Sequence, residues 1–179
     1  MKPIFLIGLP GCGKSTLGRA LAKHLGYQFY DLDYYIESRF RSSVSDIFAT
    51  VGEQEFRRRE SVLLREIGEM NDVIIACGGG TPCHGDNMEY MNSNGITVWL
   101  QASEPVLLRR IIRAKSRRPM FAACPDDEAI ANKLLQLTQS READYSKASH
   151  TFNGDELENR QMIDNSVNRF IKEIINSNP

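Results

Sequence analysis

The sequence lacks a dominant charge, a long apolar run and a cysteine spacing typical of a metal site. Its 179 residues carry 22 Lys and Arg against 23 Asp and Glu, and the net charge of -1 gives no general attraction to nucleic acid. No apolar stretch approaches the ~20 residues that a membrane-spanning helix needs. The first predicted strand begins almost at the N-terminus, so we expect no signal peptide. We therefore expect neither nucleic acid nor a membrane as a partner.

The four cysteines, Cys12, Cys77, Cys83 and Cys124, share no metal-ligand spacing. They are expected to be reduced thiols of a cytoplasmic protein. A length of 179 residues with 41% hydrophobic content fits one domain over 1–179, and the sequence has no repeats and no low-complexity linker. Because no large unexplained apolar face is visible, we expect a monomer.

The most informative stretch is GLPGCGKST, residues 8–16. Its spacing, Gly-x-x-x-x-Gly-Lys-Ser, is typical of a phosphate-binding loop. The apolar run at 3–7 predicts a buried strand before the loop, and the pattern at 14–25 predicts a helix after it, with Gly26 at the C-cap. Strand, loop and helix in this order indicate that the chain binds a nucleoside triphosphate.

Backbone N–H groups of such a loop turn inward and hold an anion at the positive end of the helix. Lys14 is expected to reach the β- and γ-phosphates, and the Ser15 hydroxyl to hold Mg²⁺. Cys12 is either a reactive thiol whose modification blocks ATP or a small residue that fits the loop, and we favour the second interpretation. The expected nucleotide contacts of the loop are Gly11, Cys12, Gly13, Lys14, Ser15 and Thr16.

Two carboxylates lie at the C-terminal end of the second predicted strand, which spans 28–32. Asp31 and Asp33 are expected to share a side and to lie near the phosphate loop, because ligands of open α/β sheets bind outside the carboxyl ends of the strands. One could hold Mg²⁺ while the other meets an acceptor hydroxyl. Alternatively, or in addition, Asp33 caps a helix over 34–40.

A basic cluster, Arg57, Arg58 and Arg59, lies in a predicted helix over 53–70 that follows a short helix at 45–51. Such a cluster is either a solvated helix face or a source of bidentate contacts to a substrate carboxylate. Periodicity cannot choose among the three arginines. The residues expected to form the buried stripe of the longer helix are Phe56, Val62, Leu63 and Ile67.

Three consecutive glycines, Gly78, Gly79 and Gly80, follow a predicted buried strand at 72–76. They add nothing to a core, so we expect the backbone to approach a ligand closely here, although a flexible loop is the alternative. Because this strand does not end in an aspartate, Asp31 is the candidate Mg²⁺ carboxylate.

The second half of the chain continues the alternation of strands and helices. The basic segment at 113–125 is expected to be a lid that closes over phosphates, or otherwise a surface loop. The other predicted elements are a strand at 96–100, a helix at 104–112, a helix at 126–145 that carries Arg141, a strand at 150–152 and a helix at 156–176.

Six motifs follow one another along nearly the whole chain: GLPGCGKST at 8–16, DLD at 31–33, FRRRE at 56–60, GGGTP at 78–82, RRPM at 117–120 and READY at 141–145. In this order they resemble the shikimate kinase family. The resemblance implies an α/β P-loop fold with three layers and a five-stranded parallel sheet of order 2-3-1-4-5. It also implies a shikimate-binding region at about 33–61 and transfer of the γ-phosphate of ATP to the 3-hydroxyl of shikimate.

The resemblance also implies residue roles. Asp33 matches the acidic residue at the acceptor hydroxyl, Arg57 and Arg141 match the pair that grips the shikimate carboxylate, and Arg118 matches the lid arginine that meets the phosphates. Lys14, Mg²⁺ and Arg118 would together offset charge on the transferring group. The three glycines, of which Gly79 and Gly80 match the backbone at the ring hydroxyls, complete the expected substrate contacts.

The position that often carries an adenine-stacking arginine in this family holds Ile111 here. The candidates for the adenine contact are Arg110, Arg113, Asn153 and Arg160. Alternative functions are another small-molecule P-loop kinase, such as a gluconate kinase, or a nucleotide-dependent switch without catalytic activity. An adenylate kinase fits the start of the chain, but the later motifs do not fit a nucleotide acceptor.

Overall fold

The structure, a computed structural model, describes residues 1–114 and 119–176. Its centre is a five-stranded sheet of order β2-β3-β1-β4-β5 in which every neighbouring pair is parallel. This is the expected order, and the fold prediction is confirmed. The strands are β1 Ile4–Ile7, β2 Gln28–Asp31, β3 Val73–Ala76, β4 Ile96–Gln101 and β5 His150–Asn153.

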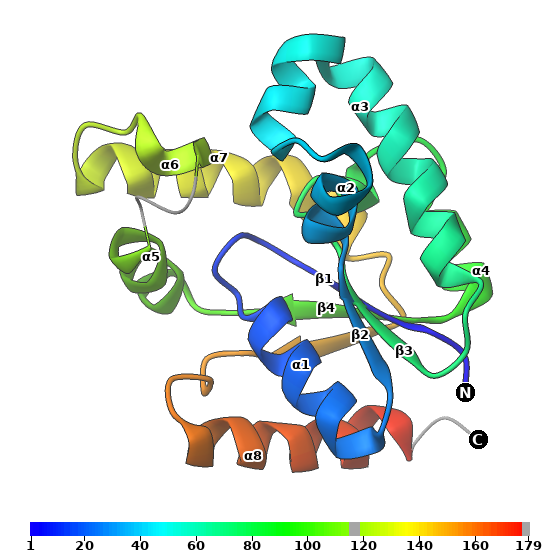
Figure 1. Ribbon diagram of the computed structural model, residues 1–179. Helices are drawn as coiled ribbons and strands as arrows, with labels where there is room; N and C mark the ends of the chain where they lie inside the picture. Colours follow the sequence, from blue (N-terminus) through cyan, green and yellow to red (C-terminus); the bar gives the residue numbers. More distant parts are fainter. Residues whose placement is uncertain (115–118, 177–179) are drawn as a thin grey trace.

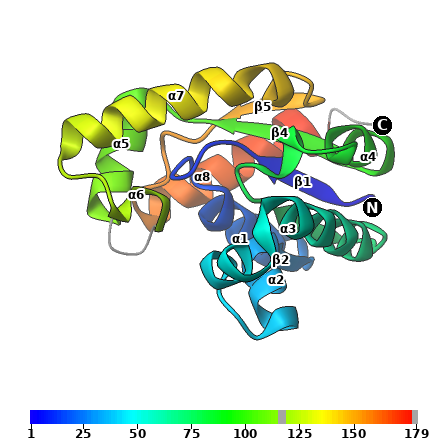
Figure 2. The same ribbon diagram turned by 90° about the horizontal axis from the view of Figure 1, so that it is seen from above.

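Helices cover both sides of this sheet. In Figure 1, α1 and α8 lie together on one side, and α3 and α7 lie on the other; Figure 2 shows the same arrangement from above. The helices are α1 Lys14–Leu25, α2 Leu32–Phe40, α3 Val44–Gly68, α4 Asn87–Asn94, α5 Glu104–Arg113, α6 Pro119–Ala122, α7 Asp127–Tyr145 and α8 Arg160–Phe170, with a 3₁₀ turn at Thr81–Cys83 and a π-helical turn at Ile171–Ile175.

The central strands place the phosphate loop. All four residues of β1 and all four of β3 are buried, as expected for parallel strands covered on both faces. β1 pairs with β3 on one side, from Ile4 opposite Ile74, and with β4 on the other. The loop that leaves β1 therefore lies at the middle of the carboxyl edge, between the segments that leave β2, β3 and β4.

The predicted helix patterns needed three corrections. Val62 is 54% exposed, so its assignment to the buried stripe was wrong; Glu60, at 1% exposure, lies on that stripe instead. Asp33 does not cap α2, because Asp31 accepts the capping hydrogen bond and Asp33 is already in the first turn. The last helix begins at Arg160 rather than at 156.

The two helices predicted in the region at 45–70 are both present, and together they form α3, with a break between them. Gly52 has a φ of 77° and a non-helical conformation, which separates the short first part from the long second part. Helix α4 was not predicted, since its sequence, NMEYMNSN, has few apolar residues. Among the residues that the structure describes, no helix is long and apolar enough to cross a membrane.

Candidate functional site

The N-terminus of α1 is built to hold an anion. Gly13, directly before the helix, has a φ of 105°, and no side chain caps the first turn, which also contains no acidic residue. The free N–H groups of this turn and the positive end of the helix dipole favour a bound phosphate. The Lys14 ammonium lies over the loop and donates to the carbonyl oxygens of Gly8 at 2.8 Å and Leu9 at 3.0 Å.

A hydroxyl and a carboxylate meet beside this loop. Ser15, in the first turn of α1, donates to Asp31 Oδ2 at 2.6 Å, at the end of β2. Both are hard oxygen donors of the kind that Mg²⁺ prefers. The described residues contain no cluster of three or more His, Cys, Asp or Glu that could hold a metal. Mg²⁺ commonly binds through one or two protein oxygens and completes its shell with substrate phosphates and water, so this pair fits it.

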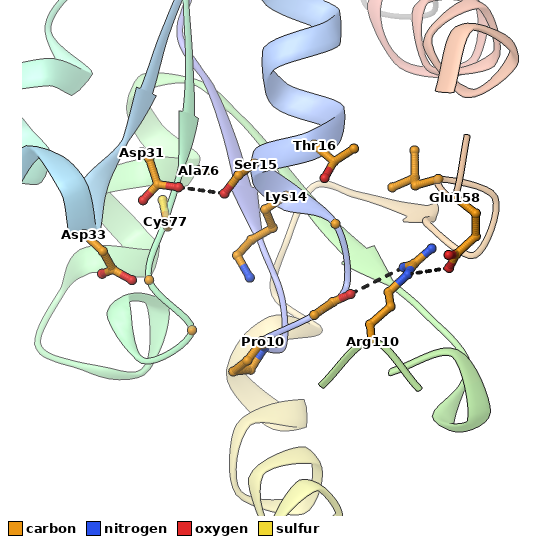
Figure 3. Close-up of a pocket in the computed structure, with 15 residues that line it drawn as sticks. Pro10, Lys14, Ser15, Thr16, Asp31, Asp33, Ala76, Cys77, Arg110 and Glu158 are labelled. Atoms are coloured by element: carbon orange, nitrogen blue, oxygen red, sulfur yellow. Dashed lines mark hydrogen bonds and ion pairs between the residues drawn. The ribbon is translucent and has the colours of Figure 1, made fainter. Parts of the chain in front are cut away.

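These groups line a cavity of about 400 Å³ at the carboxyl edge of the sheet. Figure 3 shows Asp31 and Asp33 at one end of it and Arg110 and Glu158 at the other, with Lys14 between them. A ligand that filled the cavity would therefore span from the two carboxylates to the arginine. We call the end with Asp31 and Asp33 the acceptor end and the end with Arg110 and Glu158 the nucleotide end.

Asp33 lies on the wall of this cavity, in the first turn of α2. Surrounding protein atoms desolvate its carboxyl group and, with the negative charges of Asp31 and Glu60, raise its pKa to about 6, while Lys14 opposes the rise. Its side chain is nevertheless open to the solvent-filled cavity, so the carboxyl group is enclosed and reachable at the same time. A carboxylate with a pKa nearer to neutrality is a better proton acceptor.

The three glycines after β3 leave room for three side chains. A Cβ atom on Gly78 would lie 2.7 Å from Asp33 Oδ1. On Gly79 it would lie 2.7 Å from Arg141 Nη1, and on Gly80 2.7 Å from Arg57 Nη2. A Cβ at such distances would force the neighbouring side chain to shift, so glycine here allows Asp33, Arg141 and Arg57 to approach the backbone closely. We call residues 78–80 the glycine platform.

Arg57 is held by a buried carboxylate and two aromatic rings. Its Nη1 donates to Glu60 Oε2 at 2.8 Å, while Glu60 Oε1 accepts from the Thr81 hydroxyl at 2.6 Å. The Arg57 guanidinium also lies 5.5 Å from the ring centre of Phe48 and 5.3 Å from that of Phe56, and these two rings stack on each other. This environment fixes the guanidinium against the platform.

The structure separates the three arginines among which periodicity could not choose. Arg58 and Arg59 both donate to Glu55 at 2.8 Å, on the outer side of α3, and only Arg57 of the three turns toward the platform. Arg57 Nε and Arg141 Nη1 are both buried and have no hydrogen-bond partner among the described residues, although Arg57 Nε lies 3.6 Å from Glu53 Oε1 in an ion pair. Buried donors of this kind normally have a hydrogen-bond partner.

At the nucleotide end, Arg110 occupies the cavity wall. It donates to the carbonyl oxygens of Gly154 at 3.0 Å and Asp155 at 2.8 Å, and its Nε donates to Glu158 at 3.0 Å. Of the four adenine candidates, it alone lines the cavity. Arg113 and Arg160 have side chains 69% and 92% exposed, and Asn153 lines a separate hollow between β4, β5 and α7.

One predicted contact of the phosphate loop, Cys12, does not line the cavity. Cys12 is 1% exposed, and a Cβ on Gly8 would lie 3.0 Å from its sulfur, so its side chain is packed beneath the loop. Arg118, predicted to enter from the lid, lies outside the described residues, as does the segment at 115–117. The described remainder of the predicted lid contains the end of α5 and the short helix α6.

Sequence reasoning missed two buried residues of the site, Glu60 and Tyr145. Glu60 follows Phe56 by four residues and precedes Leu64 by four, so it interrupts an apolar stripe, and this signal could have identified it. Tyr145 is 1% exposed and its hydroxyl donates to the Gly79 carbonyl oxygen at 2.5 Å. No sequence pattern indicates that contact, since α7 and the platform are far apart along the chain.

Four features together are typical of a P-loop kinase of a small anionic substrate: a phosphate loop before α1, a parallel sheet of order 2-3-1-4-5, a carboxylate in the cavity beside that loop, and two arginines at the glycine platform. Comparison with known proteins identifies which one. The family model for shikimate kinase matches residues 10–174. A shikimate kinase from Phocaeicola vulgatus is 45% identical over 174 residues, which are 97% of this chain and 99% of the relative.

Solved structures agree. A shikimate kinase from Bacteroides thetaiotaomicron matches with a TM-score of 0.92 and 43% identity, over 96% of this chain and 97% of that one. A shikimate kinase from Acinetobacter baumannii, solved in complex with shikimate, matches with a TM-score of 0.84 and 30% identity, over 99% and 95% of the two chains. The chain belongs to the shikimate kinase family and is an ATP-dependent kinase that phosphorylates shikimate.

Proposed function

We propose that Asp33 orients the 3-hydroxyl of shikimate and accepts its proton while that oxygen attacks the γ-phosphorus of ATP. A new bond forms between the hydroxyl oxygen and the phosphorus, the bond from phosphorus to the β–γ bridging oxygen breaks, and ADP leaves. Two properties of Asp33 support the role: its position at the acceptor end of the cavity and its raised pKa. Such a proton acceptor typically contributes about 10²- to 10⁴-fold to a rate.

The observation that carries the proposal is the pair of guanidinium groups at the glycine platform, each of which has one buried N–H group without a hydrogen-bond partner among the described residues. Arg57 and Arg141 reach it from α3 and α7, and each lies against one glycine. Shikimate is a carboxylate, and two guanidinium groups would hold it at a fixed distance from Asp33. Such positioning supplies much of the rate in phosphoryl transfer, where the protein performs little covalent chemistry.

Lys14 and the Ser15–Asp31 pair act on the phosphates. Lys14 would exchange its carbonyl partners for β- and γ-phosphate oxygens, and the first turn of α1 would donate its free N–H groups. Ser15 and Asp31 would hold Mg²⁺, which when bound offsets the negative charge of the phosphates. We assign the adenine side to Arg110, because it alone of the four candidates lines the cavity.

The other expectations remain proposals. Arg118 is assigned to the phosphates from the predicted lid, Arg113 is a further ATP contact, the domain extends over 1–179, and the protein is a cytoplasmic monomer.

The test is ADP release with Mg²⁺-ATP and shikimate, gluconate, AMP or no acceptor. Wild type, Asp33→Asn and Asp164→Asn are compared, the last removing an exposed aspartate of α8. We expect turnover with shikimate alone, a loss of about 10²- to 10⁴-fold in kcat for Asp33→Asn, and no loss for Asp164→Asn. Folded Asp33→Asn protein that binds ATP and keeps wild-type turnover would refute the role of Asp33. Folded wild type that binds ATP but ignores shikimate would refute the acceptor assignment.

A further inference from the structure

The last turn of α7 sends two side chains to the same glycine. Arg141 and Tyr145 are four residues apart and therefore lie on one helical face, one turn from each other. Arg141 Nη1 lies 2.7 Å from the position that a Cβ of Gly79 would take, and the Tyr145 hydroxyl donates to the carbonyl oxygen of the same residue at 2.5 Å. Helix α7 is thus attached to the platform beside the guanidinium that the proposed function assigns to the substrate.

The Tyr145 side chain of α7, which makes this contact, is held firmly in place. The Tyr145 side chain is 1% exposed, and its ring packs against Trp99 of β4 with ring centres 5.7 Å apart. A tyrosine of this kind cannot move its hydroxyl without disturbing the sheet. Its position is therefore set by β4 and α7 together, and the Gly79 carbonyl takes its orientation from them.

The orientation of the Gly79 carbonyl also fixes the direction of the next N–H group. A trans peptide is planar, so the Gly79 C=O and the Gly80 N–H point in opposite directions. When Tyr145 holds the carbonyl toward α7, the Gly80 N–H points away from it, and the plane of the Gly79–Gly80 peptide is fixed. Arg141 lies against one of these glycines and Arg57 against the other. A rotation of the peptide would disturb both contacts.

The two side chains of α7 differ in how their polar atoms are used. The Tyr145 hydroxyl has its hydrogen-bond acceptor within the protein, whereas Arg141 Nη1 is buried without a partner among the described residues. Burial raises the pKa of Tyr145, and the positive charge of Arg141 and a side-chain hydrogen bond with Arg141 oppose the rise, so the hydroxyl stays protonated and able to donate at neutral pH. Tyr145 thus holds the backbone and also contacts Arg141, which keeps one buried N–H group without a hydrogen-bond partner in the part of the chain that the structure describes.

We infer that Tyr145 is a positioning residue for shikimate: by holding the Gly79 carbonyl it sets the platform against which Arg141 binds the substrate carboxylate. This inference rests on the role proposed above for Arg141. Tyr145 does not touch the reacting atoms and does not act on ATP. Its loss should therefore weaken shikimate binding and leave nucleotide binding intact.

The test is Tyr145→Phe, which removes only the hydroxyl. We expect the KM for shikimate to rise about tenfold, the size of one lost hydrogen bond in a buried site, with the KM for ATP within about twofold of wild type. The matched control is Tyr90→Phe, because the Tyr90 hydroxyl also donates to a backbone carbonyl, that of Arg65 at 3.3 Å, outside the cavity lining. The control should leave both KM values unchanged.

A double-mutant cycle separates positioning from mere support of the fold. Arg141→Met removes the guanidinium, and adding Tyr145→Phe to it should raise the shikimate KM by less than about twofold further, because the group that Tyr145 positions is already gone. Three results would each overturn the inference. The first is a double variant whose shikimate KM rises by the full product of the two single effects. The others are an equal rise in the KM for ATP in Tyr145→Phe and a Tyr145→Phe protein that does not fold. If Arg141→Met leaves the shikimate KM unchanged, the proposed role of Arg141 fails first and Tyr145 loses its function with it.

Discussion

The protein uses glycine at its two ligand-binding regions for different physical reasons. In the phosphate loop, Gly8 and Gly13 have φ values of 141° and 105°, which side chains of L-residues rarely adopt. None of the three platform glycines has a positive φ, yet a Cβ on any of them would meet a functional side chain at 2.7 Å. The loop needs glycine for its backbone conformation, and the platform needs it for space.

This difference follows from how each region is assembled. The phosphate loop is one continuous segment, 8–16, whose backbone itself forms the phosphate site. The acceptor end is built from α2, α3, α7 and the platform after β3, and its chemistry is carried by side chains that meet only in the folded chain. Changes in the loop should therefore damage the fold and ATP binding, whereas changes in the platform should act on shikimate alone.

The largest effect is expected for Gly8→Ala. The new Cβ would lie 2.4 Å from the Leu100 carbonyl oxygen, a backbone atom that cannot move aside, and the φ of 141° adds strain. We expect a loss of roughly 3 kcal/mol in the free energy of unfolding and no measurable ATP binding. Urea unfolding measures the loss of stability, and nucleotide titration measures the loss of ATP binding. A variant as stable as wild type would show that the loop needs no special conformation at Gly8.

Glu60→Gln should have the next largest effect. The side chain keeps its shape but loses the negative charge of the carboxylate, which accepts hydrogen bonds from Arg57 and from the Thr81 hydroxyl. We expect a loss of about 1–3 kcal/mol in stability, and a rise of about tenfold or more in the shikimate KM with an unchanged KM for ATP.

Glu55→Gln is the matched control for Glu60→Gln, because Glu55 also binds two arginines of α3 but on the outer surface. It should change stability by less than about 1 kcal/mol and neither KM value. Equal kinetic effects of the two variants would mean that burial of Glu60 has no part in substrate binding.

Gly79→Ala tests the comparison most directly. Its Cβ would meet the end of the Arg141 side chain, which can move, so the fold should lose less than about 1 kcal/mol. Arg141 would be displaced from its place, and we expect the shikimate KM to rise about tenfold while the KM for ATP stays the same. A variant with impaired ATP binding or a stability loss like that of Gly8→Ala would remove the distinction between the two glycine segments.

The same difference explains what could be predicted from the sequence. The order of strands and helices and the phosphate loop follow from local patterns, and these were largely correct. Periodicity could not choose Arg57 over its neighbours, because the choice depends on Glu55 and Glu60 lying on different sides of α3, and only the family resemblance singled it out. Val62 was placed in the core because apolar residues were counted while a buried glutamate was not considered, and the Tyr145 contact depends entirely on tertiary packing.

The smallest effect is expected for the stability of Asp33→Asn in Mg²⁺-free buffer. The pKa of Asp33 is about 6 in the folded chain against 3.8 as its ordinary value, so the folded state binds the proton more tightly than the unfolded state. The stabilisation from that proton is complete below pH 4 and is lost as the pH rises through 6. At pH 7 the variant should therefore be more stable than wild type, by less than about 1 kcal/mol because the carboxyl group is open to solvent.

Urea unfolding at several pH values between 5 and 7.5 measures this difference for Asp33→Asn, with the exposed Asp164→Asn as the control, whose stability relative to wild type should change little with pH. The gap between Asp33→Asn and wild type should widen as the pH rises toward 6 and then stay constant. The inactive variant would then be the more stable one, which means that the acceptor end gives up stability to keep a carboxylate beside Asp31 and Glu60. A variant less stable than wild type at pH 7 would instead show that the Asp33 carboxylate supports the fold.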